Sequence, residues 1–355
     1  MSILNLIRAE LLTAPSYIPG GEHSKARLHA NELPWSPVTA DAVNLNFYPQ
    51  SALQLQLQKQ LALRYQVALN QIVLTRGSDD GIDLITRLFL KAGQDALMQF
   101  TPTFSMYSFY VRLQQAQTID CPLDPANGFS LSINQINKYW QPNCKIIMFC
   151  RPNNPTANLL DLELIASVCK HYANQSLVVV DEAYIEFSQA QSATTLIPQF
   201  ENLVVLRTLS KACGLAGLRV GSIIAQAHVI DACKSIMAPY ALSTPVMRLA
   251  NQALKKNDWF LTTTQRITKT RNWLINRLQE HPIIETIYPS ETNFILVKTR
   301  YAKELTAWFA SHGIAVKEFP NSAQLLQHLR ITVGDEQQSQ SLIAALSSFS
   351  PKGLS

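Results

Sequence analysis

The chain has 355 residues, of which 47% are hydrophobic and only 15% are charged. This length predicts about two domains, and the apolar content is ample for a large core, which excludes an intrinsically disordered protein. The net charge is +5, but the basic residues are scattered, and Lys255-Lys256 is the longest uninterrupted run. Because nucleic-acid-binding proteins gather basic residues on one face, we expect no nucleic-acid partner.

Six cysteines lie at positions 121, 144, 150, 169, 213 and 233, and none forms a Cys-x-x-Cys pair. No His and Cys cluster has the spacing of zinc ligands, so we predict no metal site. Scattered cysteines in apolar segments are typical of reduced core residues. The segment Met1–Ser16 carries Arg8 and Glu10 and has no long apolar run. It indicates neither a secretion signal nor a membrane span, so we expect a cytoplasmic protein without a membrane partner.

The first predicted element is ambiguous. Leu53–Gln58 reads LQLQLQ, and this strict alternation fits a half-buried strand. However, leucine and glutamine are good helix formers, and Leu53, Leu57 and Leu61 fall on one face of a helix. We therefore predict a helix here.

Strand-like and helix-like segments then alternate up to about Ala225. The expected strands are Gln71–Thr75, Ala96–Phe100, Lys145–Cys150, Leu177–Val180, Leu203–Leu206 and Arg219–Ala225. The expected helices are Ser78–Leu90, Phe104–Gln115 and Leu162–His171. Because apolar strands separated by helices form sheets buried on both faces, this pattern predicts an α/β domain with a mostly parallel central sheet.

The pattern changes after Pro245. Residues 246–280 contain neither glycine nor proline and predict two helices that meet near Asn257-Asp258. Shorter segments follow at Asn293–Lys298, Tyr301–Ser311, Ile314–Glu318 and His328–Val333, with a final helix from about Asp335. They indicate a smaller α+β domain. We predict an N-terminal arm at 1–45, a large domain at 46–245 and a small domain at 246–355.

Four segments carry residues suited to chemistry: RGSDDGI (76–82), CRPNNPTAN (150–158), VVVDEAYIEF (178–187) and RTLSKACGLAGLRVG (207–221). Asp181 directly follows an apolar strand, and the carboxyl ends of parallel strands are where such sheets bind ligands. Tyr184 could share that site. Taken alone, Asp181 could equally cap a turn, and Tyr184 could belong to the core.

The other three segments are also ambiguous when taken singly. Lys211 follows a strand, although most lysines are surface charges. Arg219 precedes an apolar run and needs an anionic partner there. Asn154 lies in a turn between prolines, and Ser78-Asp79 opens a helix whose free N–H groups can bind an anion. An ordinary turn and an ordinary helix start would look the same.

Together and in this order, the segments resemble the fold-type I, pyridoxal-phosphate-dependent aminotransferases of the histidinol-phosphate aminotransferase family. The likeness extends from LHANELPW (28–35) to HLRITVG (328–334). It implies pyridoxal 5'-phosphate (PLP) as cofactor and a homodimer with shared active sites. It also implies transamination of L-histidinol phosphate with 2-oxoglutarate to imidazole-acetol phosphate and L-glutamate, a reaction of histidine biosynthesis.

The resemblance implies a role for each matching residue near the cofactor ring. Lys211 would form the internal Schiff base and carry the proton between substrate and cofactor. Asp181 would pair with the protonated pyridine nitrogen, which keeps the ring an electron sink. Asn154 and Tyr184 would donate to the 3′ oxygen of the ring. Phe104 would stack on the ring face, where many relatives have tyrosine.

The cofactor phosphate would be held by the backbone N–H groups of Ser78 and Asp79 and by the side chains of Thr208, Ser210 and Arg219.

Further residues are matched to the partner subunit and the substrate. Tyr48, in FYPQ, would reach the cofactor phosphate of the neighbouring subunit. Arg330, in LRITVG, would bind the anionic group of the substrate, since its planar fork suits a carboxylate or a phosphate; otherwise it would pair with a carboxylate such as Glu318 or Asp335. Tyr17 and Asn31 would line the substrate pocket, because the resemblance implies that the N-terminal arm at 1–45 contributes to this pocket and to the small domain.

Two positions depart from the family pattern. Ala157 follows PNNPT in place of the usual glycine, so the backbone there adopts either a negative φ or a strained conformation. Leu33 stands in the variable position of NELPW.

The pattern also has three alternative interpretations, of which the first two stay open. They are an aromatic amino-acid aminotransferase, an L-threonine-phosphate decarboxylase, and a non-catalytic PLP-sensing transcription regulator. The regulator would need an N-terminal DNA-binding domain, whereas here the aminotransferase-like pattern begins by about Tyr17.

Overall fold

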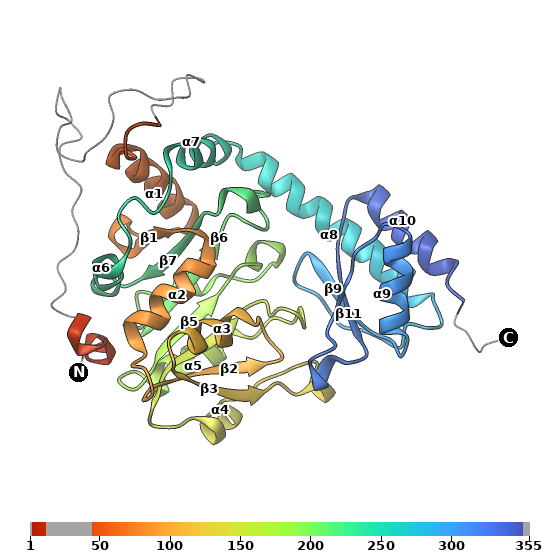
Figure 1. Ribbon diagram of the computed structural model, residues 1–355, viewed down its shortest axis with the longest axis horizontal. Helices are drawn as coiled ribbons and strands as arrows, with labels where there is room; N and C mark the ends of the chain where they lie inside the picture. The colour runs from red at the N-terminus through yellow and green to blue at the C-terminus, as the bar shows by residue number, and fades with distance from the viewer. Residues whose placement is uncertain (1, 12–44, 351–355) are drawn as a thin grey trace.

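The computed structural model describes residues 2–11 and 45–350, which form two sheets with helices packed around them (Figure 1). The larger sheet has seven strands in the order β1-β7-β6-β5-β4-β2-β3. These strands are β1 Ile72–Thr75, β2 Ala96–Thr101, β3 Gln117–Pro122, β4 Cys144–Cys150, β5 Leu177–Asp181, β6 Leu203–Thr208 and β7 Gly221–Ala225. The helices that accompany this sheet are α1 Ser51–Tyr65, α2 Gly77–Phe89, α3 Met106–Leu113, α4 Ile133–Tyr139, α5 Leu162–His171, α6 Ala227–Ile236 and α7 Thr244–Ala253.

The larger sheet is mostly parallel, as predicted. Strands β3, β2, β4, β5 and β6 pair in parallel, while β7 is antiparallel to both of its neighbours, β6 and β1. The apolar strand residues alternate between two separate core layers, as the two-residue period of a strand requires. Leu177 and Val179 of β5 face the layer formed with α2, α3 and α6. Val178 and Val180 face the layer formed with α1, α4, α5 and α7.

The smaller sheet has four strands in the order β10-β11-β9-β8, all paired antiparallel. The strands are β8 Thr286–Ile287, β9 Phe294–Lys298, β10 Lys317–Glu318 and β11 His328–Thr332, and the helices are α8 Asn257–Gln279, α9 Ala302–Ser311 and α10 Glu336–Ser347. Figure 1 shows the long helix α8 running from beside α7 and the larger sheet to the smaller one. This α/β architecture with a smaller α+β part agrees with the predicted fold class.

The ambiguous LQLQLQ segment is helical, as predicted. It belongs to α1, in which Leu57 and Leu61 are completely buried and Leu53 packs against the same core. The leucines lie four residues apart, so a helix buries them on one side, and the glutamines between them face outward or to the edge.

Three predicted boundaries were wrong. Arg219 does not belong to a strand, because its backbone is left-handed (φ 52) and β7 begins at Gly221. Helix α3 begins at Met106, after Phe104. In the segment predicted as Ile314–Glu318, only Lys317–Glu318 form a strand.

Strand β3 was missed altogether. It lies at the edge of the larger sheet and alternates between exposed and buried residues, so it lacks the apolar run that revealed the central strands.

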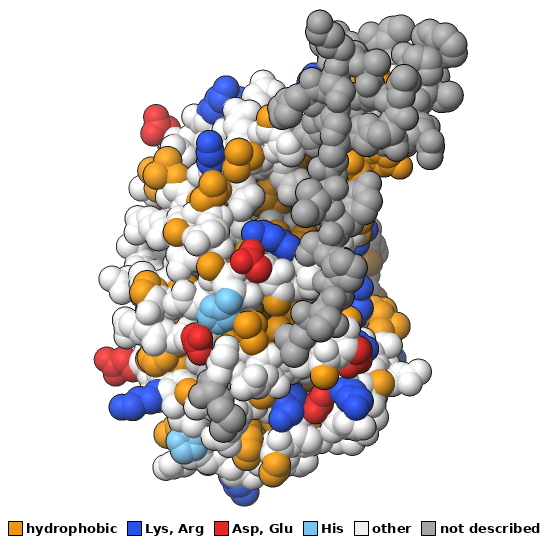
Figure 2. Space-filling view, turned by 90° about the vertical axis from the view of Figure 1, so that its left-hand side faces the viewer, with side chains coloured by type: hydrophobic (Ala, Val, Ile, Leu, Met, Phe, Trp, Pro, Cys, Tyr) orange, Lys and Arg blue, Asp and Glu red, His pale blue; other side chains and the backbone are white. Residues whose placement is uncertain are grey.

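All six cysteines are buried and free, as expected of core residues. Within residues 2–11 and 45–350, no cluster of His, Cys, Asp and Glu could hold a metal ion. None of the described helices is both long and apolar enough to cross a membrane. The face drawn in Figure 2 carries its basic side chains dispersed among acidic and apolar ones.

Gly221 sets the distance between β7 and the start of α2. A Cβ at this position would lie 2.3 Å from the carbonyl carbon of Gly77 and 2.5 Å from the backbone nitrogen of Ser78. We predict that Gly221→Ala lowers the free energy of unfolding by about 3 kcal/mol or more, because backbone atoms would have to move. Gly217→Ala is the control, since its Cβ would meet no atom within 4 Å. Equal urea-unfolding midpoints for both variants would contradict the prediction.

Candidate active site

The floor of the candidate site lies where β5 ends. Asp181 is the last residue of β5, is 2% exposed, and lies beside Cys150 in the neighbouring strand. The phenol of Tyr107 donates a hydrogen bond to Oδ2 of Asp181 at 2.8 Å, and the backbone N–H of Ala183 donates to Oδ1 at 3.1 Å. Burial raises the pKa of Asp181 to about 6, although these two hydrogen bonds act against the shift.

A group of hydrogen-bond donors lies where α2 begins. Arg219 donates from Nη1 to the Ser210 hydroxyl at 3.3 Å and from Nη2 to the Asp79 carboxylate at 3.2 Å. The backbone N–H of Ser210 donates to the Thr208 hydroxyl at 3.1 Å. Gly77 opens α2 with φ +79, and a Cβ there would lie 2.7 Å from Nη2 of Arg219. A helix N-terminus with a guanidinium and two hydroxyls can hold a phosphate-like anion. Ser78 and Asp79 lie in the first turn of α2, and we call these two residues together with Thr208, Ser210 and Arg219 the anion cup.

A second group joins the two sheets. Arg330, on β11 of the smaller sheet, donates a hydrogen bond from Nη1 to the side-chain oxygen of Asn154. The Asn154 amide in turn donates to the Tyr184 hydroxyl at 3.5 Å. The Nζ of Lys211 lies 5.6 Å from the centre of the Tyr184 ring. The structure therefore brings the four predicted residues Asn154, Tyr184, Lys211 and Arg330 together.

The alternative pairing of Arg330 is not observed. Glu318 lies opposite Leu329 in the β10–β11 register, and Lys317 lies opposite Arg330. Within the described part of the chain, no ion pair joins Arg330 to Glu318 or Asp335.

The charges of both groups act on Lys211. Burial lowers the pKa of Lys211, Arg330 and Arg219 lower it further, and Asp79 and Asp181 oppose the shift. A lysine with a lowered pKa is more often neutral near pH 7, and a neutral amine can act as a nucleophile or a base.

The remaining predicted residues are placed as follows. Phe104 is half-buried and meets the Tyr107 ring edge-on, with the ring centres 5.6 Å apart. Tyr48 is 48% exposed, and its ring stacks on that of Tyr240 with the ring centres 4.5 Å apart. It belongs neither to the anion cup nor to the group formed by Asn154, Tyr184, Lys211 and Arg330. Tyr17 and Asn31 lie outside the described residues.

Ala157 adopts the strained alternative. Its φ is +64, a conformation that costs a non-glycine residue roughly 1–2 kcal/mol. Its carbonyl accepts a hydrogen bond from the backbone N–H of Glu291 at 2.9 Å, so the turn that carries Asn154 is tied to the segment leading into β9. The other departure, Leu33, lies outside the described residues.

A buried ion cluster, not expected from the sequence, lies on the opposite face of the sheet. Glu182 is completely buried and accepts from Arg151 Nη1 at 3.1 Å and from Arg207 Nη1 at 3.5 Å. Arg207 also donates to Glu186 at 2.7 Å and lies over the Tyr65 ring at 4.4 Å. These charges join the ends of β4, β5 and β6. The sequence carried a signal for this cluster, because Arg151 and Glu182 are charged residues that follow directly after apolar strands.

Tyr107 was also missed. It follows Phe104 by three residues, and its backbone N–H donates to the Phe104 carbonyl at 3.3 Å in the turn that leads into α3, but only the tertiary contact reveals its bond to Asp181.

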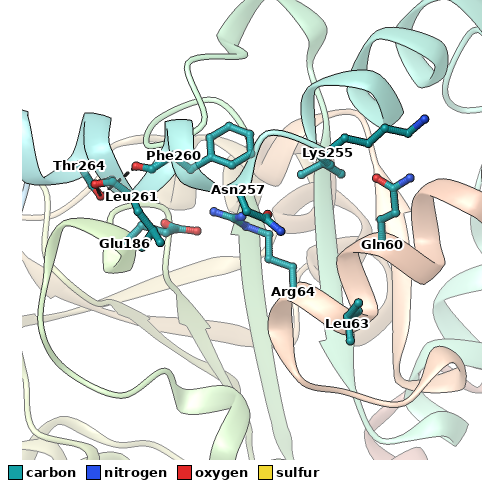
Figure 3. Close-up of a pocket in the computed structure, with 10 residues that line it drawn as sticks. Gln60, Leu63, Arg64, Glu186, Lys255, Asn257, Phe260, Leu261 and Thr264 are labelled. Carbon is teal, nitrogen blue, oxygen red and sulfur yellow. Dashed lines mark hydrogen bonds between the residues drawn. The ribbon is translucent and has the colours of Figure 1, made fainter.

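A separate cavity of about 630 Å³ lies between α1, the short helix Ile185–Phe187 and α8 (Figure 3). Arg64 from α1 lies over the Phe260 ring at 4.8 Å on its wall. None of the described residues that were predicted for the site lines this cavity. Glu186 lines the cavity and also belongs to the ion cluster. The cavity therefore borders the cluster, on the face of the sheet opposite Asp181.

A family model described as aminotransferase class I and II matches residues 19–346. The histidinol-phosphate aminotransferase 1 of Legionella pneumophila subsp. pneumophila is 63% identical over 349 residues, covering 98% of this chain and 96% of the relative. The chain therefore belongs to the class I and II aminotransferases.

Solved structures share the fold. The histidinol-phosphate aminotransferase of Sinorhizobium meliloti in complex with pyridoxal-5'-phosphate has a TM-score of 0.75 at 22% identity, covering 85% of this chain and 82% of that one. The L-threonine-O-3-phosphate decarboxylase of Porphyromonas gingivalis has a TM-score of 0.74 at 24% identity, covering 86% of this chain and 91% of that one. The predicted fold-type I architecture is confirmed.

The ion cluster should contribute strongly to stability. Glu182→Gln would leave Arg151 and part of the Arg207 guanidinium buried without their carboxylate, and breaking a buried pair typically costs about 3–5 kcal/mol. We predict a loss of this size in urea unfolding. Asp231→Asn is the control, because the exposed Asp231–Lys234 pair should be worth less than about 1 kcal/mol. Similar losses in the two variants would mean that the cluster is energetically unimportant.

Proposed function

We propose that this aminotransferase uses PLP to transaminate L-histidinol phosphate with 2-oxoglutarate, giving imidazole-acetol phosphate and L-glutamate in histidine biosynthesis. The observation that carries the proposal is the convergence of Arg330, Lys211 and the anion cup around Asp181. The Legionella relative, 63% identical over nearly the whole chain, supports the choice of substrate through its name.

The residues present fit PLP group by group. The anion cup of Ser78, Asp79, Thr208, Ser210 and Arg219 suits a phosphate. Asp181 offers the carboxylate that a pyridinium nitrogen requires, and it has room for another donor because each carboxylate oxygen can accept two hydrogen bonds.

The other polar groups suit the remaining cofactor atoms. Asn154 and Tyr184 offer donors for the ring oxygen, Lys211 offers the amine that would hold the cofactor, and Phe104 offers an aromatic face. When bound, PLP would supply an electron sink for the electron pair left by the broken C–H bond of the substrate.

Lys211 would move the proton. Its lowered pKa favours the neutral amine, which can take the proton from the α-carbon of the substrate. Arg330 sits across from it on the smaller sheet and is joined to Asn154, so a substrate held by Arg330 would be oriented relative to Lys211. A guanidinium binds a carboxylate or a phosphate with two hydrogen bonds, so Arg330 could serve both histidinol phosphate and glutamate.

We further propose a homodimer in the cytoplasm, with Tyr48 contributing to the cup of the partner subunit. The support is the match of FYPQ to the family pattern and the partial exposure of Tyr48. Sedimentation of the purified protein at dimer mass would agree with this, and a monomer would exclude shared sites. The arm at 1–45 and the domain limits at 245 and 246 remain predictions.

A panel of amino donors tests the substrate. Histidinol phosphate, glutamate, phenylalanine and tyrosine would each be mixed with the PLP-loaded protein, and conversion of the cofactor to its amino form would be followed by absorbance. We expect fast conversion by histidinol phosphate and glutamate. Faster conversion by the aromatic amino acids would favour the aromatic aminotransferase. Release of carbon dioxide from L-threonine phosphate would favour the decarboxylase, whose fold is shared.

Arg330→Ala should weaken binding of both amino donors. We expect the apparent affinity for histidinol phosphate and for glutamate to fall tenfold or more, on the scale of roughly 1.5–3 kcal/mol for hydrogen bonds to a charged group. Stopped-flow measurement of each half-reaction checks this. Arg300→Ala, which changes an exposed arginine of the same part of the chain, is the control. Unchanged affinities together with a lower melting temperature would show that Arg330 is only structural.

A further inference from the structure

We propose that Tyr107 is a positioning residue for the proposed reaction: its phenol holds the Asp181 carboxylate in one orientation and in its charged form, so that Asp181 can keep the cofactor nitrogen protonated. This inference rests on the proposed function of the site. Tyr107 would act through Asp181.

The geometry fixes both carboxylate oxygens. Tyr107 donates to Oδ2 at 2.8 Å, and the N–H of Ala183 donates to Oδ1 at 3.1 Å. A backbone N–H can only donate, and a phenol that donates its single proton favours an acceptor that is ionised. A protonated Asp181 would accept both bonds more weakly, because hydrogen bonds to an ionised acceptor are stronger than those to a neutral one. The two donors therefore stabilise the anion and prevent the carboxyl group from rotating.

Tyr107 is well placed to remain a donor. Its side chain is completely buried in the core layer formed with α2 and α3, and Phe104 packs edge-on against its ring. Burial raises the pKa of Tyr107 well above its usual value, and Asp181 and Cys150 raise it further, so the phenol keeps its proton. The neighbouring Cys150 is also neutral, because burial raises the pKa of its thiol to about 12.

Two other charged groups act on Asp181 in opposite directions. Lys211 lowers the pKa of Asp181, whereas Asp79 raises it. Tyr184 is uncharged, since burial raises its pKa. Burial destabilises the charged carboxylate of Asp181. In the cofactor-free protein, the hydrogen bond from Tyr107 is the contact that does most to stabilise that charge.

The inference predicts a pH-dependent effect on stability. The pKa of Asp181 is raised in the folded protein to about 6. The folded state therefore binds a proton more tightly than the unfolded state, and ionisation of Asp181 costs stability as the pH rises through that value. Loss of the phenol would raise the pKa further. Tyr107→Phe should thus be more destabilising at about pH 8 than at about pH 5.

The first experiment measures melting temperature of the cofactor-free protein across this pH range. Tyr107→Phe should show a melting deficit that grows with pH, and this growth should vanish in an Asp181→Asn background. Tyr110→Phe removes a phenol from a half-buried position of the same helix and should show no such growth. A deficit of Tyr107→Phe that is the same at every pH, or that persists unchanged with Asp181→Asn, would overturn the proposal.

The second experiment uses the PLP-loaded enzyme and glutamate alone. Tyr107→Phe should lower the rate of the half-reaction by roughly tenfold or more, the scale of one hydrogen bond to a charged group, with little change in apparent affinity. The acid limb of its pH–rate profile should move to higher pH. An unchanged rate and profile would refute the inference. Because neither experiment uses histidinol phosphate, a wrong substrate would be recognised separately by the donor panel.

Discussion

The alternation of side chains at the ends of β5 and β6 is the constraint on which the site depends. Successive residues of a strand point to opposite faces, so Asp181 and Thr208 face α2 and α3, while Glu182 and Arg207 face the other layer. One face carries the candidate active site, and the other carries the ion cluster that joins the same strand ends. The cluster thus holds the backbone from which the site residues project.

The site is completed only where the two sheets meet. Arg330 comes from the smaller sheet and Asn154 from the turn after β4, and a hydrogen bond joins them. The bond from the N–H of Glu291 to the strained Ala157 ties the same turn to the segment that leads into β9 of the smaller sheet. Tyr184 meets Phe294 of β9 edge-on at 5.2 Å. Each contact places a residue of the smaller part against the strand ends, so the distance between Arg330 and Lys211 depends on this junction.

Asp181 and Lys211 are buried without enough opposite charge around them, and a charged cofactor would supply it. Burial raises the pKa of Asp181 and lowers the pKa of Lys211, so both groups are pushed toward their neutral forms. A phosphate in the anion cup and a cationic ring nitrogen beside Asp181 would each supply the opposite charge that these positions lack. Tyr107 provides part of this compensation for Asp181 within the chain itself.

The sequence by itself determined the fold class, the helix at 53–58, the central strands and the order of the site residues, because these follow from local periodicity and from motifs within short segments. Only the tertiary structure decided that Arg330 pairs with Asn154, that Tyr107 bonds to Asp181, and that Glu182 gathers two arginines. These pairs join residues far apart in the chain, and no local pattern encodes which distant donor meets which acceptor. The left-handed backbone at Arg219 and Ala157 was likewise set by surrounding packing, which overrides the preference of either residue.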